Sequence, residues 1–162
     1  MTTRALSLFK EKVYLMNRVK EFMTIKNLFL GADYVWGSEN LEECDCSGLI
    51  CGTLTLMGNK IRINAEDIRQ ILTRNDNQFY DESKVKLGFF ISPENKAKHV
   101  GIITDNSLFC HASYPKGVAF EDLNHTINRY NLQGYTFEKK MLDFDKVDEH
   151  TGLIYDLDEE LS

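Results

Sequence analysis

The sequence has little proline and no segment that would divide it. Its two prolines are Pro93 and Pro115, and it contains no Gly/Ser-rich linker, internal repeat or low-complexity stretch. The 162 residues suffice to bury a core, and 43% apolar and 27% charged residues are ordinary values for a globular protein. We therefore expect a single domain over residues 1–162.

Long apolar runs are also missing. Lys10, Glu11 and Lys12 interrupt the apolar residues near the N-terminus before they reach the length of a secretory signal. No stretch approaches the roughly 20 apolar residues that a membrane-spanning helix needs. We expect a protein that is made in the cytoplasm, does not insert into a membrane, and reaches any other compartment by another route.

Positive charge is scarce as well. The chain has 19 Lys and Arg residues against 25 Asp and Glu residues, for a formal net charge of -6. General binding to nucleic acids needs a basic face, so this balance argues against a nucleic-acid partner. It also offers no electrostatic attraction to anionic wall polymers.

Helical spacing is found in the first half of the chain. Apolar side chains recur every three or four residues from about Leu8 to Leu28, which predicts an amphipathic helix. An apolar segment from Cys46 to Met57 predicts a buried helix, with Asp45 near its N-terminal end and Gly58 past its C-terminal end. Residues 66–73 could form another short helix.

The second half predicts strands. A hairpin is expected around a turn at Asp105 and Asn106. The predicted strands cover Val85–Ser92, His99–Ile103, Leu108–Ala112 and Tyr135–Leu142, with a helix over about Phe120–Tyr130 before the last one. Helices followed by strands indicate an α+β domain in which N-terminal helices pack on an antiparallel sheet.

The C-terminal tail, about residues 143–162, is acidic. It carries eight Asp and Glu residues and one lysine. This composition predicts a solvated, partly frayed end, although the segment Leu153–Tyr155 could still dock on the body.

Cys46 has the surroundings of a nucleophile. A reactive cysteine must lose its proton, and the N-terminus of a helix favours the thiolate. Ser47 and Gly48 follow it, and such small residues would let a substrate carbonyl approach the sulfur and nearby backbone N–H groups. A lone cysteine on an apolar helix is more often a core residue, so further groups are needed.

Two histidines are candidates for the groups that would activate Cys46. His99 opens one strand of the predicted hairpin and His111 lies on the other. One imidazole could therefore contact Cys46 while the second orients the first. The combination predicts cysteine-dependent nucleophilic catalysis.

The four cysteines also raise the question of zinc. Cys44 and Cys46 form a Cys-x-Cys pair, and Cys51, Cys110 and the two histidines could add ligands. We disfavour this interpretation because the spacing lacks a Cys-x-x-Cys knuckle, and we expect neither a metal nor an organic cofactor. Cys51 and Cys110 should be buried, whereas Cys44 could form a disulfide with an oxidised Cys46.

Four segments of the sequence resemble those of the NlpC-type cell-wall peptidases, in the same order and with the same spacing. The resemblance runs from about Gly31 to Ala119. The segments are Tyr34-Val35-Trp36-Gly37, Asp45-Cys46-Ser47-Gly48-Leu49-Ile50, His99-Val100-Gly101-Ile102 and His111-Ala112-Ser113.

The resemblance implies a papain-like fold and a catalytic triad. By carry-over, Cys46 is the nucleophile, His99 is the general base, and His111 orients His99. Tyr34 would lie beside the nucleophile and help to hold the oxyanion, although it could equally be a core residue.

The same resemblance implies substrate contacts. Asp45 and Ser47 flank the nucleophile and would contact a peptidoglycan stem peptide, Asp45 through a free L-alanine amine. Arg62 falls where the family often has a proline-arginine pair, but here Ile61 replaces the proline.

Other positions depart from the family pattern or are expected to play no part in catalysis. Val85-Lys86 stands where a Gly-Asp pair commonly precedes the Leu-x-Phe-Phe strand, and Ser38 replaces a glycine. Trp36 is expected to pack in the core beneath the active-site loop. His125 and His150 lie in polar surroundings and are not expected to be catalytic.

These features predict a monomeric cysteine endopeptidase that cleaves peptidoglycan stem peptides, at the bond joining D-γ-glutamate to a diamino acid. A phage lysis enzyme released by a holin, an effector exported by a secretion machine and an enzyme that recycles muropeptides are all compatible settings. Two alternatives remain open. One is a papain-like amidase or acyltransferase acting on another amide or on lipid, and the other is a non-catalytic domain that binds stem peptides.

Overall fold

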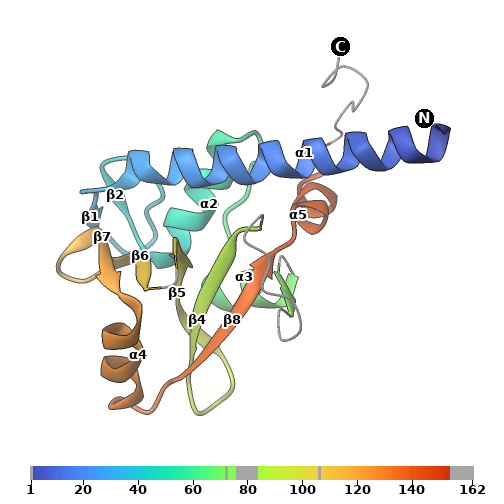
Figure 1. Ribbon diagram of the computed structural model, residues 1–162. Coiled ribbons are helices and arrows are strands. Elements are labelled where there is room, and N and C mark those ends of the chain that lie inside the picture. Colours follow the sequence, from blue (N-terminus) through green and yellow to red (C-terminus); the bar gives the residue numbers. More distant parts are fainter. Residues whose placement is uncertain (1, 72, 76–83, 106, 154–162) are drawn as a thin grey trace.

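A six-stranded antiparallel sheet forms the centre of the computed structural model, which describes residues 2–71, 73–75, 84–105 and 107–153 (Figure 1). The strand order is β3-β8-β4-β5-β6-β7. The strands are β3 (Thr73–Asn75), β4 (Lys86–Ile91), β5 (Ala97–Ile103), β6 (Leu108–Ser113), β7 (Gly117–Asp122) and β8 (Thr136–Leu142).

Helices surround this sheet. The long α1 (Thr3–Ile25) runs across one end of the sheet and continues into the short 3-10 helix η1 (Lys26–Phe29) (Figure 1). The other helices are α2 (Cys46–Leu56), α3 (Ala65–Ile71), α4 (Leu123–Asn131) and α5 (Phe144–Thr151). Two short strands, β1 (Asp33–Tyr34) and β2 (Glu43–Cys44), pair in parallel just before α2.

Alternation along the strands divides the core between the two faces of the sheet. Phe89 and Ile102 belong to the larger apolar cluster, which also contains the buried side chains of α2. Their strand neighbours Phe90 and Ile103 belong to a second cluster, which includes Leu123 of α4. Because successive strand residues point to opposite faces, α2 and α4 cover different faces of the sheet.

The predicted fold class is confirmed, and the predicted helices and strands are present with shifted bounds. The elements that were not predicted are β1, β2, β3, β7 and α5. Helix α1 begins at Thr3 rather than near Leu8, because the Thr2 hydroxyl accepts a hydrogen bond from the Ala5 N–H at 3.1 Å and caps the helix. The predicted hairpin is present as β5 and β6, although Asn106 of its turn lies outside the described residues.

The prediction of a helix from Phe120 was wrong at its start. Residues 117–122 form β7, which pairs with β6 from Leu108↔Asp122 to Ser113↔Gly117. The helix begins only at Leu123, because the Asp122 side chain caps it by accepting from the His125 N–H. The sequence Gly-Val-Ala-Phe-Glu-Asp of this edge strand does not alternate between apolar and polar residues, so it gave no period-2 signal.

The prediction of a frayed acidic tail was wrong over residues 144–151. This segment is α5, capped by Asp143, with Phe144 and Val147 buried. Of the segment Leu153–Tyr155, Ile154 and Tyr155 lie outside the described residues.

A buried ion pair explains why part of this acidic segment is ordered. Arg18 of α1 is 1% exposed, and its Nη1 donates to Asp148 Oδ1 of α5 at 2.8 Å. Arg18 also donates to the Tyr14 hydroxyl at 2.5 Å and to the Asn59 side chain, while Asn59 Nδ2 donates to Asp148 at 2.9 Å. These contacts join two helices that are distant in the sequence.

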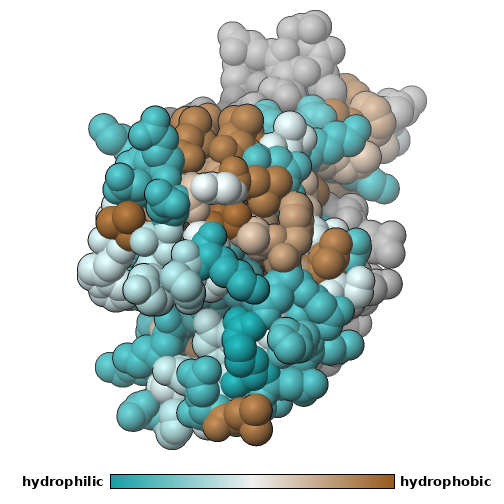
Figure 2. All heavy atoms as spheres, turned by 90° about the vertical axis from the view of Figure 1, so that its left-hand side faces the viewer, coloured by the Kyte–Doolittle hydropathy of each residue, from teal (hydrophilic) through white to brown (hydrophobic). Residues whose placement is uncertain are grey.

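Apolar side chains also remain at the surface. Figure 2 shows them gathered in the upper part of one face, above a mostly hydrophilic lower part. The structure has no helix in its described residues that is long and apolar enough to cross a membrane.

We expect Arg18→Met to lower the free energy of unfolding by about 3–5 kcal/mol, because it leaves the Asp148 carboxylate partly buried without its cation. Urea denaturation measures this change. Lys20→Met, at an exposed position of the same helix, is the matched control and should stay within about 0.5 kcal/mol of the unmodified protein. Equal effects of the two substitutions would show that the pair does not anchor α5.

Candidate active site

Cys46 is the first residue of α2, and the residue before it caps the helix. Asp45 has an extended backbone, and its Oδ1 accepts a hydrogen bond from the Gly48 N–H at 2.7 Å. The positive end of the helix dipole therefore lies at Cys46, where it favours a thiolate. The capping role predicted for Asp45 is confirmed.

The second oxygen of the same carboxylate holds the preceding loop. Asp45 Oδ2 accepts from the Gly37 N–H at 2.7 Å, and the Asp45 N–H donates to the Ser38 carbonyl at 3.0 Å. A Cβ atom on Gly48 would lie 2.0 Å from that Ser38 oxygen. The close approach of the loop backbone thus requires glycine at position 48. From the sequence, this glycine was expected only to let a substrate approach the sulfur.

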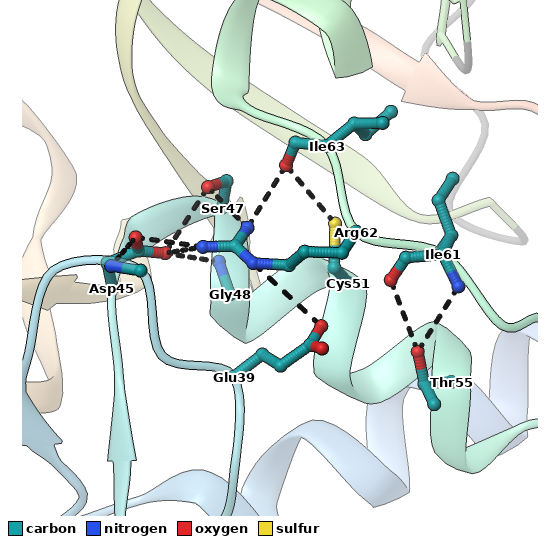
Figure 3. Close-up of polar contacts among 10 residues, drawn as sticks. Glu39, Asp45, Ser47, Gly48, Cys51, Thr55, Ile61, Arg62 and Ile63 are labelled. Carbon is teal, nitrogen blue, oxygen red and sulfur yellow. Dashed lines mark hydrogen bonds and ion pairs between the residues drawn. The ribbon is translucent and has the colours of Figure 1, made fainter.

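Arg62 completes this cluster (Figure 3). Its Nη2 lies 2.9 Å from each Asp45 carboxylate oxygen, and its Nη1 donates to Ser47 Oγ at 2.9 Å. One guanidinium nitrogen thus contacts both carboxylate oxygens, and these charge-assisted hydrogen bonds hold Arg62 against Asp45. The structure therefore brings together Asp45, Ser47 and Arg62, three residues that were predicted to bind substrate. Asp45 and Ser47 are 3% and 5% exposed, and their contacts with substrate stay a prediction.

The two predicted histidines also meet. His99 of β5 and His111 of β6 lie with Nε2 and Nδ1 2.7 Å apart, and they are 7% and 2% exposed. The His99 ring stacks on Tyr130 of α4, with 5.3 Å between ring centroids and an angle of 17° between the planes. Packing on one side and the hydrogen bond on the other fix the His99 ring.

The α2 helix packs against β5 and brings the cysteine to this histidine strand. Against the larger effect of burial, the backbone N–H of Val100, the residue after His99, acts on the Cys46 sulfur and lowers the pKa of its thiol. Tyr34 lies close enough that burial first, and then the charges of Cys46 and Asp45, raise the pKa of its hydroxyl. The position of Tyr34 beside the cysteine agrees with the prediction, while its role on an oxyanion stays a prediction.

Burial decides the resting protonation states. It raises the pKa of the Cys46 thiol to about 11, although the Val100 N–H acts in the opposite direction. It also lowers the pKa of His99 to about 3, and the neighbouring His111 and Arg129 add to this effect. Near pH 7 the resting site therefore holds a thiol and a neutral imidazole. Moving the thiol proton to His99 creates opposite charges that stabilise one another.

A carboxylate extends the histidine pair. His111 Nε2 lies 3.0 Å from Glu121 Oε1 of β7, and Arg129 of α4 forms an ion pair with the same carboxylate. Neither residue was predicted to belong to the site, because residues 120–130 were predicted to form one helix that included Glu121. An edge strand over residues 117–122, paired with the His111 strand, is the feature that would have indicated them.

Other predictions had mixed outcomes. Trp36 is 83% exposed, so its predicted place in the core was wrong. Cys51 and Cys110 are buried, as predicted, and His125 and His150 are exposed.

Cys44 has no exposed surface, and burial raises the pKa of its thiol to about 12. A thiol that attacks an oxidised cysteine needs thiolate character, which this environment opposes. Within the described part of the chain, no group of three or more His, Cys, Asp or Glu residues could hold a metal ion.

Comparisons with known proteins place this arrangement among related folds. A sequence model of the NlpC/P60 family matches residues 31–136. A solved Staphylococcus aureus structure, described as similar to lipoprotein and of the NLP/P60 family, is 24% identical with a TM-score of 0.58, over 77% of this chain and 41% of that one. No curated protein sequence matches the chain.

Two further structures have the same fold at lower identity. The peptidoglycan hydrolase RipB from Mycobacterium tuberculosis is 15% identical with a TM-score of 0.59, over 79% of this chain and 66% of that one. An N-acetylmuramoyl-L-alanine amidase from Bacteroides uniformis is 12% identical with a TM-score of 0.52, over 76% of this chain and 98% of that one. The chain spans 42%, 41% and 46% of the first three solved structures that it matches.

We expect His99→Ala to suppress alkylation of Cys46 by iodoacetamide at pH 7 by at least about 100-fold, because the buried thiol then has no base. Its reaction should recover only as the pH rises toward the raised pKa of about 11. Mass spectrometry of tryptic peptides separates Cys46 from the other three cysteines.

His125→Ala, which removes an exposed histidine of α4, is the matched control and should react like the unmodified protein. Equal rates for the His99 and His125 variants would show that His99 does not activate Cys46.

Proposed function

Because the chain belongs to the NlpC/P60 family and has its papain-like fold, we propose that it is a cysteine hydrolase of the bacterial cell wall. The bond cleaved is the one between D-γ-glutamate and the diamino acid of a peptidoglycan stem peptide. The observation that carries the proposal is the position of Cys46, at the capped N-terminus of α2 and against the strand of a hydrogen-bonded His99–His111 pair.

In the proposed reaction, His99 takes the Cys46 proton while the sulfur attacks the γ-carbonyl carbon of the D-glutamyl residue. The carbonyl oxygen becomes an oxyanion, which the backbone N–H groups at the start of α2 and the Tyr34 hydroxyl stabilise. Collapse of this intermediate breaks the C–N bond as His99 returns the proton to the leaving amine. Water, deprotonated by His99, then hydrolyses the thioester and restores the thiol.

The cluster around Arg62 supplies the proposed substrate contacts. Arg62 is 30% exposed and lies on the Asp45 and Ser47 side chains, so it can meet the stem peptide while holding both of them. The Asp45 carboxylate already accepts hydrogen bonds from Arg62. In the proposed complex, the free L-alanine amine and Arg62 would both contact this carboxylate. The proposed enzyme acts as a monomer on cell-wall peptides or muropeptides and requires no cofactor. It is made in the cytoplasm and reaches the wall with the help of a holin or a secretion system.

The likeness to the Bacteroides uniformis amidase supports a second candidate on the same site. An amidase would use the same Cys46 thioester chemistry but would cleave the amide between the muramic acid lactyl group and L-alanine. The two activities leave different products, so one digestion separates them.

The digestion uses purified peptidoglycan with meso-diaminopimelate, lysine or ornithine and, in parallel, free stem peptides from each wall, which carry the L-alanine amine. Mass spectrometry identifies the soluble products. We expect fragments that end in γ-D-glutamate from the unmodified protein and none from Cys46→Ala. Cys110→Ala removes a buried cysteine outside the site and serves as the matched control.

Release of intact stem peptides that begin with a free L-alanine would show that the protein is an amidase rather than an endopeptidase. Intact free stem peptides together with undigested material from all three walls would contradict both activities.

A further inference from the structure

The polar chain behind Cys46 does not end at His111. It continues to the carboxylate of Glu121 on β7, whose side chain is 13% exposed, and from there to Arg129 on α4. The residues come from three neighbouring strands and the helix that follows them, so the geometry depends on β7 being a strand. The proposed reaction does not use this carboxylate directly.

Glu121 remains ionised at neutral pH. Burial acts to raise its pKa, but hydrogen bonds from Arg129 and His111 outweigh burial and lower the pKa to about 2. An ionised carboxylate can only accept hydrogen bonds. His111 Nε2, 3.0 Å from Oε1, must therefore carry a proton and donate it.

This donor sets the tautomers of both histidines. With its proton on Nε2, a neutral His111 has an unprotonated Nδ1 that can only accept. His99 Nε2, 2.7 Å away, must then be the donor. The proton of a neutral His99 thus lies on Nε2, which leaves Nδ1 unprotonated and able to take the proton of Cys46.

We propose that Glu121 is a positioning residue that acts through His111 to keep His99 in the tautomer needed for a general base. The inference rests on the proposed cysteine-hydrolase function, because a general base at His99 is needed only if Cys46 acts as a nucleophile. Its content is the proton arrangement of the two histidines, which can be measured without a substrate. The same carboxylate also stabilises the imidazolium that forms on His99 when Cys46 loses its proton.

Several other groups face these histidines. The Tyr130 ring of α4 stacks on His99, and Cys46 of α2 lies close enough to Tyr130 that, after the larger effect of burial, its charge raises the pKa of the Tyr130 hydroxyl. Arg129 of α4 and Lys116 of the β6–β7 turn place positive charge near His111 and lower its pKa, after the larger effect of burial, whereas Glu121 raises it. Glu121 is therefore the anionic group among these neighbours that can favour an imidazolium.

Two substitutions separate the tautomer role from a structural ion pair. Glu121→Gln and Arg129→Met both break the Glu121–Arg129 pair. Arg129 only donates, so the carboxamide oxygen of Gln would face Arg129 and its NH₂ group would face His111 Nε2. That contact inverts both tautomers and puts a proton on His99 Nδ1. Arg129→Met keeps the carboxylate and therefore keeps the tautomers.

The first measurement uses long-range ¹H–¹⁵N correlation spectra of ¹⁵N-labelled protein at pH 7. We expect the Nε2-H tautomer for both His99 and His111 in the unmodified protein and in Arg129→Met, and the Nδ1-H tautomer in Glu121→Gln. A proton on Nδ1 of either histidine in the unmodified protein would overturn the proposal, even if the Gln variant does not fold.

The second measurement is the rate of Cys46 alkylation at pH 7, with folding checked by circular dichroism. We expect a fall of at least about tenfold for Glu121→Gln and less than about threefold for Arg129→Met. Equal falls in both variants would reduce Glu121 to one half of a structural ion pair. Both readouts are independent of peptidoglycan, so a failure to cleave stem peptides would overturn the proposed function without touching this inference.

Discussion

The Asp45 carboxylate is the contact on which the rest of the site depends. It accepts hydrogen bonds from the Gly48 N–H at the start of α2 and from the Gly37 N–H of the preceding loop. Both of its oxygens also accept from Arg62 Nη2 (Figure 3). One side chain thus caps the helix, closes the loop and positions a cation. Cys46 is the next residue, so its direction follows from these contacts. Because Asp45 is 3% exposed, loss of Arg62 would leave its buried carboxylate without a cation.

The sheet supplies the second half of the site. Its strands place His99, His111 and Glu121 on three adjacent strands, while α4 adds the Tyr130 ring and the Arg129 guanidinium from the side of the second apolar cluster. A rigid sheet suits this purpose because the ring nitrogens must keep hydrogen-bond distances of 2.7 and 3.0 Å. Both histidines are at most 7% exposed, so their proton arrangement is set by their partners rather than by solvent.

The sequence predicted those parts of the structure in which a local pattern and the fold agree. The apolar run after Cys46, with Asp45 before it, indicated α2 and its cap, and the two histidines indicated a hairpin.

Parts of the structure that depend on partners distant in the sequence were not predicted. Arg18 on an amphipathic helix gives no sign that it is buried against Asp148, and the acidic segment containing Asp148 has the composition of a solvated tail. Glu121 was not predicted to belong to the site, because β7 is an edge strand without clear alternation. The partner of Glu121, His111, is ten residues away in the sequence. Trp36 has the residue type of a core position, but its place on the loop held by Asp45 leaves it exposed.

The central claim is that these contacts make Cys46 a nucleophile that forms a thioester with a stem peptide. The most direct measurement is mass spectrometry of the intact protein and of its Cys46 peptide, after acid quenching within milliseconds of mixing with purified muropeptides. We expect a transient mass increase on Cys46 equal to the acyl fragment that ends in γ-D-glutamate, with release of the diamino acid portion in the same period. Cleavage of the muropeptide with no adduct on Cys46 at any time, and at an unchanged rate in Cys46→Ala, would contradict it.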